Sequence, residues 1–204
     1  MEEIEKTKFN ICLLGDCGVG KTHICSVQCG EEFDGQSRIT IGFNYMQNSY
    51  VIDGKEYNFK IFDTAGQEQF KAMSMQTIHI ADGFLVIFDV TDKDSFKNLD
   101  FWVNCINQGC NIDDKAVMLI GNKVDKDNRE VTEQEAVDYA RKNKMKYFEV
   151  SAKEKINIHA AFQNIYIDVY NKYQMIKKNE DERRRTSVTI SRDKIIKKKK
   201  RKFC

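Results

Sequence analysis

The chain has 204 residues, of which 41% are hydrophobic and 31% are charged. This length fits one α/β domain with a short appendage and supplies enough apolar residues to bury a core. The longest apolar run, around Phe84–Phe88, is far too short to cross a bilayer, and Met1–Lys8 is too charged for a signal peptide. Composition therefore argues against a membrane-spanning or secreted protein and predicts a cytoplasmic one with reduced cysteines.

The formal net charge of +2 hides an uneven distribution. Residues 177–204 carry 13 Lys or Arg and 4 Asp or Glu, whereas the preceding 176 residues carry 20 and 27. An acidic globule with a basic end is not typical of a nucleic-acid-binding domain, so no nucleic-acid partner is expected. It is typical of a domain with an electrostatic tether.

Apolar runs and helical patterns alternate along the chain. The expected elements are, in order, a strand at Phe9–Leu14, two strands at Tyr45–Ile52 and Tyr57–Phe62 joined by the hairpin signal Asp53-Gly54, a strand at Phe84–Val90, a helix at Ser95–Asn107, a strand at Ala116–Ile120, a helix at Thr132–Lys142 that opens on a capping box, a strand at Lys146–Val150 and a helix at Ile156–Ile176. This alternation predicts an α/β fold: a six-stranded, mostly parallel sheet with one antiparallel edge strand and helices on both faces.

The boundaries of these patterns divide the chain into three parts. Residues 1–7 form an N-terminal extension and residues 8–176 the globular domain. From Lys177 the hydrophobic periodicity stops and charge runs begin, so residues 177–204 are expected to be a flexible basic tail.

The most specific motif is a glycine-rich loop between the first predicted strand and a helix. It reads Gly15-Asp16-Cys17-Gly18-Val19-Gly20-Lys21-Thr22 and matches the pattern G-x-x-x-x-G-K-[ST]. Such a loop curls its backbone N–H groups around a polyphosphate, and the N-terminus of the following helix adds its dipole. Lys21 is expected to contact the β- and γ-phosphates and the Thr22 hydroxyl to bind Mg²⁺, and the predicted site extends to His23.

A second motif, Asn122-Lys123-Val124-Asp125, identifies the base. It follows a predicted strand, at the end of the sheet where nucleotides bind. The Asp125 carboxylate can accept hydrogen bonds from N1–H and the exocyclic amine of guanine, whereas adenine would leave it unpaired. Alone, this tetrapeptide could equally be a polar turn, but the phosphate motif upstream favours a guanine site.

Two further segments follow predicted strands. In Asp63-Thr64-Ala65-Gly66-Gln67-Glu68, we expect Asp63 to hold Mg²⁺, Gly66 to let a backbone N–H approach the γ-phosphate and Gln67 to orient an attacking water. In Ser151-Ala152-Lys153, the Ala152 N–H is placed to meet the guanine carbonyl.

These four elements, in this order, resemble the Ras superfamily of small GTPases over about residues 8–175. The resemblance implies that Thr40 is the switch I threonine that closes on Mg²⁺ and the γ-phosphate. It also implies that Phe33 packs against the base, although spacing alone would make it a core residue. A slow GTPase cycle follows, with Gln67, Thr40 and Lys21 contributing to catalysis, and with exchange factors and activating proteins controlling the switches.

Within this superfamily, three segments are most similar to Rab proteins: Ile41–Tyr45, Phe59–Phe62 and Phe84–Asp92. The sequence departs from that pattern where Phe62 replaces the usual tryptophan and Thr77-Ile78 replaces the usual tyrosine pair. The resemblance implies a role in vesicle traffic. Exchange factors, activating proteins and effectors would contact Ile39–Tyr45 and Ala65–Ile80.

The end of the chain predicts membrane docking. Six basic residues, Lys197–Lys202, precede Phe203 and a terminal Cys204. A solvated charge run or a nuclear-localisation patch would fit the basic residues alone. In a Rab-like protein this arrangement indicates prenylation of Cys204, with the polybasic run as the second membrane signal. The expected location is the cytosolic face of endomembranes or the plasma membrane, although a lone cysteine is neither a C-a-a-X box nor the usual double cysteine.

Two other functions fit part of the pattern. A GTP-binding scaffold with little hydrolysis would not need Gln67 and Thr40. A nucleotide kinase would need an arginine-rich lid segment, and it leaves Asn122–Asp125 without a role.

Overall fold

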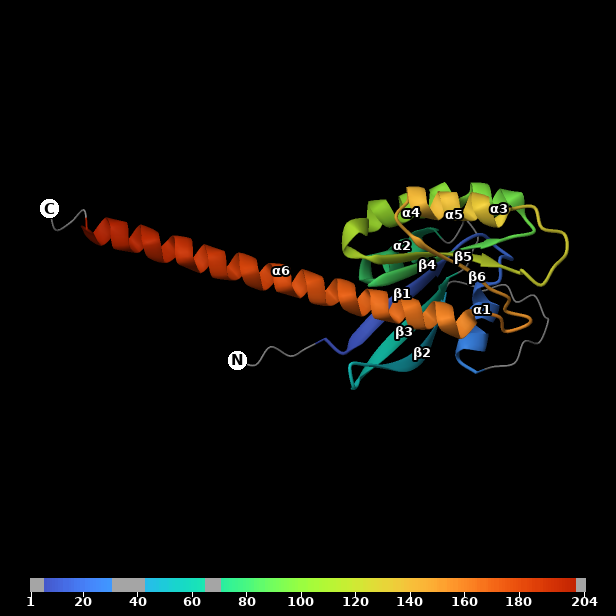
Figure 1. The fold of residues 1–204 in the computed structure, drawn as a ribbon, viewed down its shortest axis with the longest axis horizontal. Helices are drawn as coiled ribbons and strands as arrows, with labels where there is room; N and C mark the ends of the chain where they lie inside the picture. The colour runs from blue at the N-terminus through green and yellow to red at the C-terminus, as the bar shows by residue number, and fades with distance from the viewer. Residues whose placement is uncertain (1–5, 31–42, 65–70, 201–204) are drawn as a thin grey trace. The chain divides into compact units, whose positions relative to one another are not determined.

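The computed structural model describes the chain at residues 6–30, 43–64 and 71–200, and its side chains at 6–30, 44–64 and 75–183. Six strands form one sheet in the order β2-β3-β1-β4-β5-β6 (Figure 1). Their bounds are Lys8–Leu14 (β1), Phe43–Ile52 (β2), Lys55–Thr64 (β3), Gly83–Asp89 (β4), Ala116–Asn122 (β5) and Lys146–Glu149 (β6). β2, at the edge, pairs antiparallel with β3, and every other pair is parallel, which confirms the predicted mixed sheet.

The β2–β3 hairpin turns where its sequence signal lies. Asp53 has φ 51° and Gly54 has φ 77°, so both turn residues adopt the left-handed backbone that a two-residue hairpin requires. In the parallel pairing of β1 with β3, Asp63, near the end of β3, lies beside Leu13 of β1. The ends of β1 and β3 therefore open at the same edge of the sheet.

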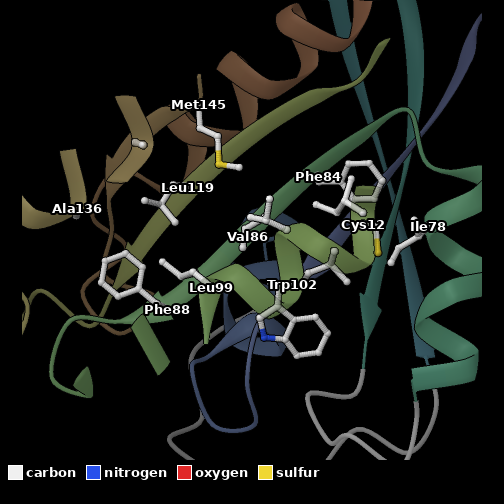
Figure 2. Close-up of a cluster of buried hydrophobic side chains, with 14 of the residues drawn as sticks. Cys12, Ile78, Phe84, Val86, Phe88, Leu99, Trp102, Leu119, Ala136 and Met145 are labelled. Atoms are coloured by element: carbon white, nitrogen blue, oxygen red, sulfur yellow. The ribbon is translucent and has the colours of Figure 1, made fainter. Parts of the chain in front are cut away.

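Four helices pack on one face of the sheet: α2 (Lys71–Ile80), α3 (Lys93–Lys97), α4 (Leu99–Gly109) and α5 (Glu133–Lys142). Figure 1 shows α3, α4 and α5 on the opposite side of the sheet from α1 (Lys21–Gln28). Beneath them lies a core cluster of buried side chains from all these layers (Figure 2), including Ile78 from α2, Phe88 from β4, Trp102 from α4 and Ala136 from α5.

Aromatic side chains fill the opposite face. Tyr166, from the first part of α6 (Ile158–Lys200), stacks on Phe59 of β3 with ring centroids 4.0 Å apart. Phe59 also stacks on Phe9 of β1 at 5.6 Å, and Phe162 lies 5.9 Å from Tyr166. Helices thus cover both faces, as predicted.

Local capping explains where two helices begin. Thr132 caps α5: its hydroxyl accepts from Glu135 N at 3.2 Å, and the Glu135 carboxylate accepts from Thr132 N at 2.9 Å, which confirms the capping box. The predicted helix at Ser95–Asn107 was wrong in its boundaries, because Asp92 caps an earlier start and Asn98 separates α3 from α4. α2 was not predicted as a helix.

The last helix differs most from the prediction. α6 begins at Ile158 and continues to Lys200 rather than ending at Ile176. The sequence contains no proline and no glycine after Gly121, so no residue interrupts the helix, and Lys, Arg and Glu are good helix formers. The contacts divide the chain into residues 1–169 and 170–204, and the continuation of α6 as far as Lys200 belongs to the second. Within the described residues, no helix is both long and apolar enough to span a bilayer.

Candidate functional site

The glycine-rich loop joins β1 to α1, as its sequence requires. Gly20 has φ 100° and serves as the N-cap of α1. A Cβ atom built at Gly20 would lie 2.3 Å from Asn122 Nδ2, so both the backbone angle and the neighbouring side chain demand glycine there. At Gly18, with φ 80°, a Cβ would meet nothing within 4 Å. The loop is therefore tight at Gly20 and open at Gly18.

The Lys21 side chain folds back over this loop. Its ammonium donates to the carbonyl oxygens of Gly15 at 2.8 Å and Asp16 at 2.7 Å, and the residue is only 5% exposed. Burial lowers the pKa of Lys21 below its ordinary value, while the Asp63 carboxylate acts in the opposite direction. A buried cation held by neutral carbonyls is suited to an anionic ligand, because phosphate oxygens would offset the cost of its desolvation.

Thr22 and Asp63 meet at the mouth of the loop. The Thr22 hydroxyl donates to Asp63 Oδ2 at 2.7 Å, although 41 residues separate the two in the chain. Asp63 is 2% exposed. A hydroxyl and a carboxylate next to a phosphate loop fit Mg²⁺, which takes one or two protein oxygens and completes its shell with water and phosphate.

Asn122 ties the phosphate loop to the segment after β6. Its Nδ2 donates to the Val19 carbonyl at 2.8 Å, across 103 residues, and its Oδ1 accepts from Ala152 N at 3.3 Å. The side chain is 1% exposed. Ser151 in turn donates through its hydroxyl to Asp125 Oδ1 at 2.6 Å, which orients that carboxylate. The two predicted base-recognition segments therefore lie together beside the loop.

Lys123 adds a second link between these parts. It has φ 70°, and its ammonium donates to the Gly18 carbonyl at 2.7 Å and pairs with Asp89 Oδ2 at 2.6 Å. Asp89 Oδ1 accepts from the N–H and the hydroxyl of Thr91. Burial alone would raise the pKa of Asp89, but the bonds from Lys123 and Thr91 outweigh it and leave the pKa below its ordinary value. Asp89 is thus a stable anion that fixes Lys123.

The remaining predicted site residues differ in how exposed they are, and some lie outside the described residues. Cys17 is exposed, and His23 and Asp125 are half-buried. Lys153 is exposed and lies 3.4 Å from the Glu154 carboxylate. Phe33, Thr40, Gly66, Gln67 and Cys204 lie outside the described residues, so their predicted roles stay predictions.

Three residues at the site were missed by sequence reasoning. Asp89 could have been found, because it is a carboxylate at the carboxyl end of a buried strand. Asn98 and Trp102, which hydrogen-bond the side chain of Asp16 in the loop, gave no such signal. Their spacing on a predicted helix indicates only a half-polar helical face.

A mostly parallel sheet with a phosphate loop after β1, and with an Asn-Lys-x-Asp segment that begins at the last residue of β5, defines the class of small GTPase domains. A model of the Ras family matches residues 10–171. Ras-related protein Rab-18-B of Danio rerio is 36% identical over 165 residues, which cover 81% of this chain and 80% of that protein. Ras-related protein Rab-18 of Lymnaea stagnalis is 35% identical over 166 residues, covering 81% and 82%. The chain belongs to the Ras family and is a small GTPase.

Proposed function

We propose that this GTPase binds GTP and GDP with Mg²⁺, hydrolyses GTP slowly and acts as a membrane-docked switch in vesicle and endomembrane traffic. Nucleotide binding is supported most strongly by the two hydrogen bonds of the Asn122 side chain. One buried side chain bonds the phosphate loop at Val19 and the base segment at Ala152, so phosphate and base would be recognised by a single rigid unit.

The phosphate end of the site would work by charge and by fixed geometry. Gly15–Thr22 and His23 would surround the phosphates, with Lys21 contacting the β- and γ-phosphates. Thr22, Asp63 and Thr40 would hold Mg²⁺, which when bound neutralises charge on the phosphate oxygens. Gln67 would orient the attacking water, beside the Gly66 backbone.

The base end would select guanine. Ser151 already bonds one oxygen of Asp125, and the carboxylate has further acceptor sites for two donors on the guanine edge. Phe33, Asn122, Lys123, Ala152 and Lys153 would complete this part of the site. Asp125→Asn should weaken GTP binding and favour xanthine nucleotide; an unchanged preference for GTP in competition binding would reject the assignment.

Hydrolysis separates the switch from the scaffold alternative. Gln67→Leu should slow single-turnover GTP hydrolysis while sparing GTP affinity. A normal rate in that variant would refute the role of Gln67. A rate in the unsubstituted protein no faster than that of GTP hydrolysis in buffer without protein would instead favour a scaffold that barely hydrolyses GTP.

The traffic role rests on the relatives and on the tail. The two similar proteins carry Rab names, and the tail contains the basic run Lys197–Lys202, followed by Phe203 and Cys204. Partners would contact Ile39–Tyr45 and Ala65–Ile80; in the described part of the first, Tyr45 is 50% exposed. Cys204→Ser should move the protein from the membrane to the soluble fraction, and retention at the membrane would mean that another anchor exists.

A further inference from the structure

The phosphate loop carries a carboxylate that is held from outside the loop. Asp16 Oδ2 accepts from Asn98 Nδ2 at 2.8 Å, and Asp16 Oδ1 accepts from Trp102 Nε1 at 2.8 Å. The donors lie 82 and 86 residues along the chain, at the start of α4. We call Asp16, Asn98 and Trp102 the Asp16 clamp. With one donor on each oxygen, both the position and the plane of the carboxylate are fixed.

The stronger part of the clamp is anchored in the core. Trp102 is 4% exposed and belongs to the core cluster, where Figure 2 shows its ring at the margin of the packed side chains. An indole N–H can only donate, and a buried one normally requires a partner. Its partner here is the carboxylate of the loop. Movement of the loop away from α4 would therefore leave a buried donor unpaired, which favours the position observed.

Asp16 also helps to position Lys21. The carbonyl of Asp16 accepts from the Lys21 ammonium at 2.7 Å, so the residue contacts α4 through its side chain and Lys21 through its backbone. A carboxylate that turned toward bound phosphates would repel them and compete for the same ammonium. The clamp directs this negative charge to neutral donors on α4 instead.

We propose that Asn98 and Trp102 are positioning residues that act through Asp16 to slow the release of bound nucleotide. This inference rests on the proposed binding of guanine nucleotide. The inference predicts that the N–H of Trp102 lengthens the lifetime of the bound nucleotide, independently of how the Trp102 ring packs.

The test measures dissociation of radiolabelled GDP from the full chain in Mg²⁺ by filter retention. Trp102→Phe keeps an aromatic ring in the core and removes the donor. Because a hydrogen bond to a charged group is lost, release should be about 3- to 10-fold faster. The matched control is Ile106→Val, a change at a buried position of the same helix and the same core cluster. It should change the release rate by less than about twofold, although it also lowers stability.

The Asp16→Ala background distinguishes the clamp from general loosening of the core. There, adding Trp102→Phe should leave the release rate unchanged, because the shared bond is already absent. The same acceleration in both backgrounds would overturn the inference, as would an unchanged rate for Trp102→Phe in the otherwise unsubstituted chain. If the unsubstituted protein did not retain GDP at all, the proposed function would fail and the inference with it.

Discussion

Alanine at Gly20 tests how tightly the phosphate loop and the base segment are joined. The new methyl group would lie 2.3 Å from Asn122 Nδ2 at a backbone φ of 100°. The left-handed backbone costs roughly 1–2 kcal/mol for a residue other than glycine. Displacing Asn122 also breaks its bond to the Val19 carbonyl and leaves a buried acceptor unpaired, at about 2–3 kcal/mol in total. The expected loss for Gly20→Ala is therefore about 3–5 kcal/mol.

Gly18→Ala is the matched control, because Gly18 lies in the same loop with φ 80° but its Cβ would meet nothing within 4 Å. It should cost only the backbone term, roughly 1–2 kcal/mol. The measurement is the free energy of unfolding in urea without nucleotide, so that only losses in folding are compared. If the two variants were destabilised to within about 0.5 kcal/mol of each other, the proposed contact with Asn122 would be refuted.

Three further predictions concern stability, each measured by urea unfolding. Asp89→Asn weakens the pair with Lys123 and should cost about 1–3 kcal/mol at neutral pH. Because the pKa of Asp89 is lowered from 3.8 in the folded chain, its contribution is present above that pH and is lost as pH falls through the folded pKa. The difference from the unsubstituted protein should therefore shrink below about pH 4, and a constant difference would contradict the ion pair. Phe59→Ala removes a fully buried ring that stacks on Tyr166 and should cost about 3–5 kcal/mol; a loss under about 1 kcal/mol would mean that this face is loosely packed. Thr132→Ala removes the α5 cap and should cost about 1 kcal/mol, whereas Thr132→Ser should restore most of it.

Sequence reasoning succeeded where the signal is local. The capping box at Thr132, the hairpin at Asp53-Gly54 and the strand-loop-helix context of Lys21 each depend on neighbouring residues, so each is readable from the chain. Buried strands were also predictable, because their continuous apolar runs match a sheet covered on both faces.

Contacts across long sequence separations were not predictable in this way. Nothing in the sequence indicates that Asn122 would bond Val19 rather than the nucleotide alone, or that Asp16 would meet Trp102. Both contacts result from the order of strands in the sheet. The predicted ends of helices were wrong for a different reason. The break at Asn98 is set by caps and packing. The length of α6 is set by the lack of any residue that ends a helix.

Trp102 is the only tryptophan in the chain, and it bonds the phosphate loop directly. The tryptophan fluorescence of the protein therefore originates from one place, at the boundary between the packed interior and the loop. No extrinsic dye or engineered reporter would be needed to follow movement there, because the tryptophan emission of the unmodified protein comes from a ring whose N–H donates a hydrogen bond to Asp16.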